Sequence, residues 1–347
     1  MHYKKILVTG GLGFIGSHTV VELINNNYEV IIIDDLSNSN LDVISGIKKI
    51  TNKKINFISL DLKNKKEVID FFNKNHSQID GIIHFAAYKY VGESVSDPIK
   101  YYENNLVSLI NILSTIKELS LNMNFVFSSS CTVYGRTNNS PIKETEIIVK
   151  AESPYGNTKQ ICEEILKDFS NSYNNINVIS LRYFNPIGAH PSGEIGELPI
   201  GKPQNLVPFI TQSVIGLYPE LIVFGDDYGT KDGTCIRDYI DVVDLAKAHV
   251  ASLSYIQKEN TNKNNYETFN LGSGKGFSVL EVIKTFEKIN NIKVNFKFGD
   301  RRNGDVETIF SDIEKAGRLL KWTTQVPLEN SLKNAWTWEK KIRNKKF

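Results

Sequence analysis

A tyrosine and a lysine four residues apart are the first pair in this sequence that could do acid–base chemistry. They stand in the segment SPYGNTK, residues 153–159. Ser153 suits a helix N-cap and Pro154 the first helical turn, which places Tyr155 and Lys159 on one face of the helix. A nearby ammonium and a helix N-terminus both favour a phenolate, so we expect the pKa of Tyr155 to fall below its usual value near 10. The pattern predicts that Tyr155 is a general base and that Lys159 assists it.

A hydroxyl-rich segment offers a partner for this base. Residues 127–135 read FSSSCTVYG and follow an apolar run. Ser130 is the hydroxyl best placed to hydrogen-bond a sugar oxygen and to share a proton with Tyr155. The alternative is that these small residues only fill the end of a strand.

A glycine cluster near the N-terminus predicts a dinucleotide site. Residues 6–16 read ILVTGGLGFIG, in which Gly11, Gly13 and Gly16 fit G-x-G-x-x-G and Gly10 extends the pattern. Such glycines allow a tight turn, the close approach of a pyrophosphate and close helix–strand packing. The phosphates then bind free N–H groups at the helix N-terminus. The alternative is an ordinary glycine-rich turn.

An acid follows at the expected distance. The second apolar run, residues 28–33, ends in Asp34. An acid about 20 residues beyond the glycines hydrogen-bonds the ribose diol of a dinucleotide. Because a carboxylate there repels a 2′-phosphate, the sequence favours NAD over NADP.

Composition excludes several classes of protein. The 347 residues are 41% hydrophobic and 23% charged, with a net charge of +2, so we expect a soluble protein of about two domains and no nucleic-acid partner. The three cysteines and six histidines lack the spacing of a disulfide framework or a metal site. No apolar run is long enough to cross a bilayer, so we expect no membrane partner. With no segment that resembles a signal peptide, the expected location is the cytoplasm.

The elements that must position these residues alternate along the first half of the chain. Their pattern predicts an α/β fold, a Rossmann-type doubly wound parallel sheet whose ligands gather at the carboxyl ends of the strands. The predicted strands are residues 5–9, 29–34, 56–60, 81–85 and 124–128, and the predicted helices are 16–26, 65–75, 97–119 and 154–172. The strand ends place Asp61 and Leu62, and also Phe85, Ala86 and Ala87, at that edge. The alternative for Asp61 is an ordinary turn or helix cap.

The regular alternation of strand-like and helix-like segments ends near residue 185. Residues 188–201 are rich in glycine and proline, and helical patterns return at 205–216, 278–289 and 330–341. We read the glycines at 272, 274 and 276 as a loop and not as a second nucleotide site. We expect a NAD-binding domain over residues 1–185, with a return segment near 235–250. Residues 186–347 then form most of a smaller C-terminal α/β domain that binds the substrate.

Taken together, the motifs resemble the extended short-chain dehydrogenase/reductases and, within them, the UDP-glucose 4-epimerases. The resemblance covers nearly the whole chain, and its second-half motifs are the more specific ones. The segments that carry it are VTGG (8–11), HFAA (84–87), VGESV (91–95), YYENN (101–105), SSSCTVYG (128–135), PYGNTK (154–159), LRYFNP (181–186), GAHP (188–191), NLVP (205–208), DGT (232–234), RDY (237–239) and RRNGD (301–305).

The resemblance implies two sets of binding residues. The set for NAD is Gly10, Gly13, Phe14, Ile15, Gly16, Asp34, Asp35, Asn38, Ser39, Asp61, Leu62, Phe85, Ala86, Ala87, Lys89, Asn104, Ser128, Tyr155, Lys159 and Phe184. The set for the UDP-sugar is Lys89, Ser130, Tyr155, Asn185, Asn205, Arg237, Arg302, Asp305 and Ile309. Two arginines suit a diphosphate in charge and geometry. Asp35 and Tyr88 depart from the commonest epimerase pattern, and neither removes a required group.

The implied activity is the interconversion of UDP-glucose and UDP-galactose in galactose metabolism. Epimerisation at C4 would run through a transient 4-keto sugar and NADH, with Tyr155, Ser130 and Lys159 as the catalytic residues. The family also implies a homodimer joined by the helices that begin near Pro98 and Pro154.

Three other functions compete with this one. A nucleotide-sugar 4,6-dehydratase would need an Asp-Glu pair where this chain has Cys131 and Thr132. An epimerase of N-acetylated or uronate UDP-sugars is a second alternative, because Ile309 is intermediate between the bulky and the small wall residues that exclude or admit an N-acetyl group. A catalytically inactive NAD sensor on the same fold is the third, and the intact Tyr155 and Lys159 argue against it.

Overall fold

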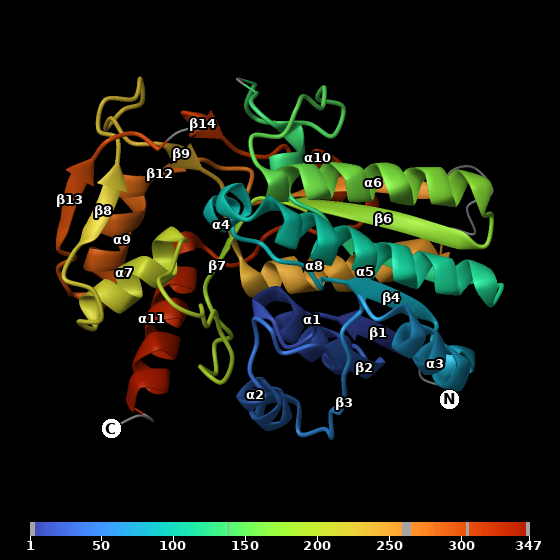
Figure 1. Cartoon of the computed structure of the whole chain (residues 1–347). Helices are drawn as coiled ribbons and strands as arrows, with labels where there is room; N and C mark the ends of the chain where they lie inside the picture. The colour runs from blue at the N-terminus through green and yellow to red at the C-terminus, as the bar shows by residue number, and fades with distance from the viewer. Residues whose placement is uncertain (1–3, 138, 259–264, 303–304, 345–347) are drawn as a thin grey trace.

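A seven-stranded parallel sheet organises the larger part of the molecule. The computed structural model describes residues 4–137, 139–258, 265–302 and 305–344. The strands lie in the order β11-β6-β5-β4-β1-β2-β3 (Figure 1). Their bounds are β1 Lys5–Thr9, β2 Glu29–Asp34, β3 Asn56–Ser59, β4 Gly81–His84, β5 Met123–Ser128, β6 Ile176–Tyr183 and β11 Tyr266–Leu271. The order reverses between β1 and β4, which is where doubly wound sheets bind their ligands.

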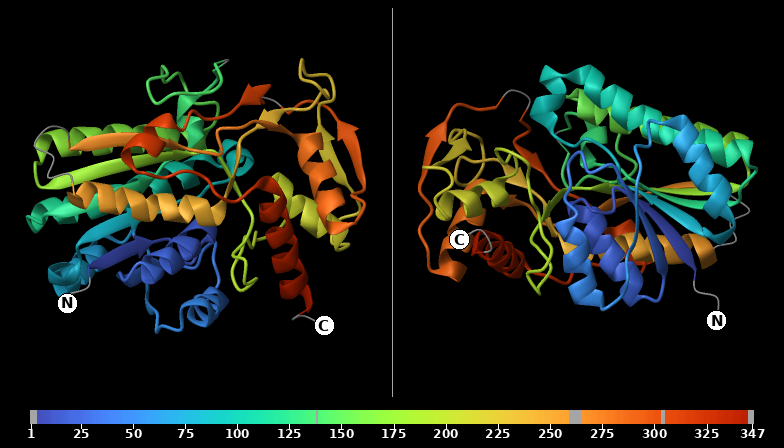
Figure 2. Two further views of the ribbon diagram at one scale, coloured as in Figure 1. Left: turned by 180° about the vertical axis from the view of Figure 1, so that it is seen from behind. Right: turned by 60° about the horizontal axis from the view of Figure 1, so that its bottom comes forward.

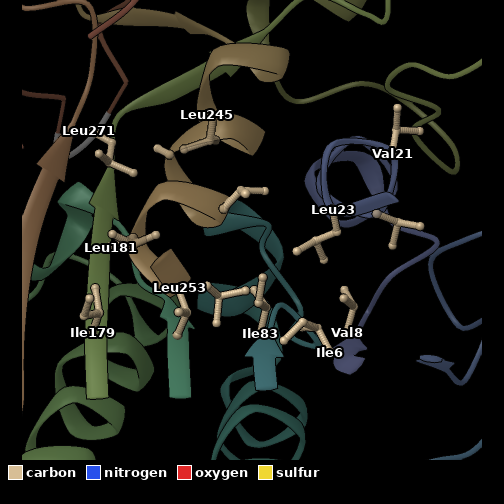
Figure 3. Close-up of a cluster of buried hydrophobic side chains, with 14 of the residues drawn as sticks. Ile6, Val8, Val21, Leu23, Ile83, Ile179, Leu181, Leu245, Leu253 and Leu271 are labelled. Atoms are coloured by element: carbon tan, nitrogen blue, oxygen red, sulfur yellow. The ribbon is translucent and has the colours of Figure 1, made fainter. Parts of the chain in front are cut away.

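Both faces of the sheet are buried, which explains the nearly continuous apolar runs of its strands. Within β1, Ile6 and Val8 belong to one core, and Leu7 between them belongs to the other, because successive side chains point to opposite faces. The first core lies against α1 (Phe14–Asn25) and α8 (Val242–Lys258), and Figure 3 shows part of it. The second core lies against three helices, α3 (Lys65–Asn75), α5 (Pro98–Glu118) and α6 (Pro154–Ser172).

A smaller unit stands beside one end of the sheet (Figures 1 and 2). Its strand pairs are β7 (Asn185–Ile187) with β10 (Tyr239–Asp241), and β8 (Leu221–Phe224) with β13 (Phe296–Gly299). A third small sheet joins β12 (Phe277–Ser278), β9 (Ile236–Arg237) and β14 (Thr308–Ile309). Helices α7 (Leu206–Val214), α9 (Val279–Asn290) and α11 (Leu328–Asn344) pack on a separate apolar core.

Three short helices complete the description. These are α2 (Asp42–Thr51), α4 (Val91–Ser96) and α10 (Glu314–Leu319). The chain also forms two short 3₁₀ helices, η1 (His76–Gln78) and η2 (Cys131–Tyr134). In the part of the chain that the structure describes, no helix has the length and apolar character of a membrane span.

The predicted fold class is confirmed, and its five strands lie within one or two residues of their expected positions. Two strands of the large sheet were not predicted. The segment YETFNL of β11 is only half apolar, and it joins the sheet beside β6 after the chain has left the sheet to build part of the smaller unit. The division of the chain into domains at residue 185 stays a prediction, and both α8 and β11 return to the larger unit after it.

A buried histidine on α8 makes the stability of this fold depend on pH. His249 is fully buried, donates from Nδ1 to the Leu245 carbonyl oxygen at 2.9 Å, and packs on the ring of Phe85, with 4.7 Å between ring centroids. Its Nε2 atom has no hydrogen-bond partner among the described residues. Burial therefore lowers the pKa of His249 from 6.5 to about 4.

We expect the free energy of unfolding of His249→Phe to decrease less than that of the wild-type protein as the pH falls. Neutral His249 contributes stability that is complete above pH 6.5 and is lost as the pH falls toward 4, because unfolding then takes up a proton. Removing this group should make the free energy of unfolding, measured by urea titration, vary less steeply between pH 5 and 6, by about 1 kcal/mol per pH unit. The control His76→Phe changes a half-buried histidine on η1 and should keep the original slope. An unchanged slope in His249→Phe contradicts the assignment.

Candidate active site

A pocket opens at the carboxyl edge of the sheet, at the switch point between β1 and β4. Its lining includes every residue of the predicted NAD set except Phe184. These residues come from the ends of β1, β2, β4 and β5, from the loop after β3, and from the beginnings of α1 and α6. The topology thus gathers at one edge residues that are more than a hundred positions apart in the sequence.

The glycine loop at the floor of this pocket has no room for side chains. Gly10 has φ +66°, and a Cβ there would lie 2.7 Å from the backbone nitrogen of Ala86. A Cβ on Gly16 would overlap the carbonyl oxygen of Gly10. Gly13 stands at the N-cap of α1 with no side chain to cover the first N–H groups. These features leave the helix N-terminus accessible to a phosphate.

Asp34 is held in place by the loops around it. Its carboxylate accepts hydrogen bonds from the Leu12 N–H at 3.0 Å, the Leu36 N–H at 3.0 Å and the Ser39 hydroxyl at 2.7 Å. Burial raises the pKa of Asp34, and these hydrogen bonds oppose the rise. The carboxylate is thus fixed at the end of β2, where a ribose diol is expected.

The predicted acid–base pair lies at the other end of the pocket. Ser153 caps α6 by accepting the Gly156 N–H at 3.1 Å, and Tyr155 and Lys159 follow on the first turns. Both side chains are buried, at 6% and 3% exposed. The Lys159 ammonium donates to the Ser128 carbonyl oxygen at 2.7 Å and lies 6.0 Å from the centroid of the Tyr155 ring. Burial lowers the pKa of Lys159 to about 8.

The expected lowering of the Tyr155 pKa is wrong for this structure. Burial raises the pKa of Tyr155 well above 10, Tyr183 adds to the rise, and the hydrogen bond with Ser130 opposes it. The reason is that the phenol is enclosed by protein, and burial disfavours the charged phenolate. Positive charge or a hydrogen-bond donor beside the hydroxyl would favour the phenolate and lower this pKa.

Ser130 reaches the site from the turn that follows β5. Its hydroxyl caps η2 by accepting the Thr132 N–H at 3.2 Å, and its side chain is 6% exposed. The extended backbone at the cap lets the chain turn away from the sheet directly after this residue. Ser130 and Tyr155 thus meet although they belong to different elements.

A buried ion pair that the sequence analysis missed holds these elements together. The Arg182 guanidinium on β6 donates to Glu163 on α6 at 2.5 to 3.1 Å, and the Ser129 hydroxyl donates to the same carboxylate at 2.5 Å. Arg182 also donates to the Tyr134 hydroxyl at 3.1 Å, which donates in turn to Asn270 of β11 at 2.6 Å. Glu163 lies one turn beyond Lys159, the only sequence signal that could have indicated it.

Three of the predicted sugar-binding residues, Arg237, Arg302 and Asp305, meet in a second cluster on the smaller unit. Arg237 and Arg302 both approach the Asp305 carboxylate, with N–O distances of 3.3 and 3.6 Å. Ile309 on β14 pairs in register with Arg237 on β9. Asn303 and Gly304 of the predicted RRNGD motif lie outside the described residues.

Phe184 and Asn185 connect the two clusters. Phe184 is buried with Val133 and Tyr134 in a small apolar core against which Ile309 packs, and it does not line the pocket. The Asn185 N–H donates to the Asp238 carbonyl oxygen at 3.0 Å, next to Arg237. Asn205 stands at the N-cap of α7 and donates from Nδ2 to Glu197 at 3.0 Å.

Among the pocket residues that the sequence analysis missed, Tyr183 and Glu197 contact predicted site residues through their side chains. Tyr183 follows Arg182 on β6, and its hydroxyl lies 2.9 Å from the Ser128 hydroxyl. It belongs to the LRYFNP motif, which could have indicated it. Glu197 pairs with Lys89 at 3.0 Å and comes from the glycine- and proline-rich segment, where no pattern marks it.

The chain is similar in sequence to known proteins over nearly its full length. The family model described as GDP-mannose 4,6 dehydratase matches residues 7–335. The UDP-glucose 4-epimerase of Bacillus subtilis (strain 168) is 46% identical over 96% of this chain and 96% of its own. That of Pasteurella multocida (strain Pm70) is 45% identical over 97% of each chain.

Solved structures of UDP-glucose 4-epimerases are also similar to this chain over nearly its full length. The UDP-glucose-4-epimerase of Stenotrophomonas maltophila, with bound NAD and formylated UDP-arabinopyranose, has a TM-score of 0.94 at 40% identity. The match covers 99% of this chain and 100% of that one. The Bifidobacterium longum enzyme in complex with NAD+ and UDP has a TM-score of 0.92 at 40% identity, covering 98% and 99%.

Proposed function

The chain belongs to the extended short-chain dehydrogenase/reductases and, within them, to the UDP-glucose 4-epimerases, and from this premise we propose which of its residues carry the reaction. The protein is an isomerase that interconverts UDP-glucose and UDP-galactose with NAD as its cofactor. The observation that carries the proposal for the catalytic residues is that Tyr155 and Lys159 line one end of the pocket and that the Ser130 hydroxyl contacts Tyr155.

The pocket suits NAD at both of its ends. Gly10 and Gly16 form a cradle that a Cβ would fill, and it lies at the N-terminus of α1, where a pyrophosphate would bind. Asp34 and the segment after it would hold the adenosine ribose, and Ser128 and Lys159 would lie at the nicotinamide end. When bound, NAD accepts the hydride from C4 of the sugar and gives it back, so that no net oxidation results.

The protein residues then move one proton and hold the sugar. Tyr155 removes the proton from the 4-hydroxyl, with Ser130 in the path between the two oxygens, and returns it to the same oxygen after the sugar has turned its other face. Lys159 in its ammonium form stabilises the phenolate, and its bond to the Ser128 carbonyl keeps it beside the ring. Arg237 and Arg302 hold the diphosphate while the hexose stays free to turn. We expect this work in galactose metabolism and in the cytoplasm, a setting that the three unpaired cysteines support.

Replacing the proposed base tests this assignment. We expect Tyr155→Phe to lower turnover about 100- to 10,000-fold, because the proton acceptor is lost, while UDP binds as before. The assay follows the conversion of UDP-galactose to UDP-glucose without added NAD, and calorimetry measures UDP binding. Tyr173→Phe is the matched control, because Tyr173 caps the far end of the same helix. Wild-type turnover in Tyr155→Phe removes this residue from the role of base.

The choice between sugars tests the role of Ile309. Its place beside Arg237, against the apolar core that contains Phe184, supports a position at the sugar wall. We expect turnover of UDP-N-acetylglucosamine to rise in Ile309→Ala and to fall at least ten-fold in Ile309→Tyr, with UDP-glucose changing much less, since pocket volume discriminates by about 1–3 kcal/mol. Parallel kinetics with both sugars make the measurement. Equal effects on the two sugars contradict a wall position.

Exposed apolar side chains support the proposed homodimer. Ile99 and Ile110 on α5 are 70% and 44% exposed, and eleven residues, about three turns, place them on one face of the helix. Isolated exposed residues are common, but an apolar stripe on one helix face suits an interface. We propose that this stripe meets its counterpart in a second copy.

Sedimentation velocity tests the dimer. The wild-type protein should sediment as a dimer and Ile110→Glu as a monomer, because a charge within the stripe must be desolvated when the interface forms. Leu217→Glu is the control, since Leu217 is 48% exposed but lies in the smaller unit. A monomeric wild-type protein, or a dimer that Ile110→Glu leaves intact, counts against the α5 interface.

A further inference from the structure

We propose that Glu197 couples the binding of NAD to the binding of the UDP-sugar. The proposal rests on the proposed function, because it takes Lys89 and Asn205 as ligand-binding residues. Glu197 itself belongs to neither predicted set. It acts on both ligands through the two side chains that it holds, and is therefore a positioning residue.

A single carboxylate oxygen makes both contacts. Glu197 Oε1 accepts from Lys89 Nζ at 3.0 Å and from Asn205 Nδ2 at 3.0 Å. Lys89 lines the pocket of the larger unit after β4, and Asn205 stands at the N-cap of α7 in the smaller unit. The bridge thus joins Lys89, which belongs to both predicted sets, to Asn205 of the UDP-sugar set across the boundary between the two units.

The backbone that carries Glu197 is anchored independently of these contacts. The Trp338 indole N–H on α11 donates to the Glu197 carbonyl oxygen at 2.8 Å. Gly196 packs directly on the Trp338 ring, which leaves no room for a side chain at that position. Glu197 is only 8% exposed, so its ion pair with Lys89 is poorly screened by solvent. The backbone of Glu197 is therefore anchored, while its carboxylate is held by Lys89, with 35% of its side chain exposed, and by Asn205.

Coupling follows because both side chains share one acceptor atom. A ligand that contacts Lys89 restricts the ammonium, and through Glu197 it also restricts the geometry in which Asn205 meets its own ligand. The second ligand then loses less conformational freedom when it binds, which gives positive cooperativity without a large structural change. Because coupling free energies are reciprocal, UDP should retain NAD by the same factor by which NAD tightens UDP.

NAD release from the holoenzyme measures this coupling. Released NAD is reduced by excess alcohol dehydrogenase and ethanol and followed by NADH fluorescence, with and without saturating UDP. We expect UDP to slow the release about five-fold or more in the wild-type protein, the lower end of usual coupling. In Glu197→Gln, which keeps the shape but removes the charge, the effect of UDP should fall below two-fold. Calorimetric titration of UDP, with and without NAD, measures the reverse effect. In Glu197→Gln, NAD should no longer raise the affinity for UDP by the wild-type factor.

Glu194→Gln is the matched control. Glu194 lies in the same segment and pairs with Lys341 and Lys49, away from both proposed sites. It should keep the wild-type effect of UDP, which separates coupling from a general loosening of the segment. Wild-type coupling in Glu197→Gln, or no coupling in the wild-type protein, overturns the proposal. Neither result depends on epimerase turnover, so a failure here is distinct from a failure of the proposed function.

Discussion

The buried ion pair between Glu163 and Arg182 is the contact on which the geometry of the site depends. Removing both charges from water is costly, and the pair is retained only because its geometry is bidentate and the remaining polar groups are satisfied. The Ser129 and Tyr134 hydroxyls provide that satisfaction. As a result α6, β6 and the turn after β5 cannot shift relative to one another without leaving a buried charge unpaired.

That rigidity matters because the two proposed catalytic groups, Tyr155 and Lys159, are both costly to ionise. Burial raises the pKa of Tyr155 and lowers that of Lys159, so each charged form is unfavourable alone. A phenolate and an ammonium held side by side offset part of each other's cost. The Ser128 carbonyl, the last residue of β5, fixes the ammonium at this place. The site therefore gains its chemistry from prepositioned charge, which is usually the largest contribution to catalysis.

The smaller unit uses a different device to hold its arginine. Asp238 is fully buried and accepts hydrogen bonds from the backbone and hydroxyl of Ser273 at 2.6 Å and from the hydroxyl of Ser311 at 2.5 Å. It thereby ties β9, which carries Arg237, to the glycine loop after β11 and to the segment after β14. A Cβ on Gly272 would overlap the Asp238 carboxylate, which explains the glycine at that position. Arg237, the proposed anchor of the diphosphate, is thus tied to an edge of the large sheet.

The sequence alone determined the features that depend on neighbours along the chain. The glycine loop, the acid at the end of β2 and the capped helix with Tyr155 and Lys159 could be predicted because short-range backbone geometry and helix spacing define them. Strand alternation likewise predicted a parallel sheet, since its buried faces require apolar runs. Only the tertiary structure decided the position of β11, the pairing of Glu163 with Arg182, the place of Glu197 and the pKa of Tyr155. Each of these depends on groups distant in sequence and on how completely they exclude water, and a linear pattern contains neither quantity.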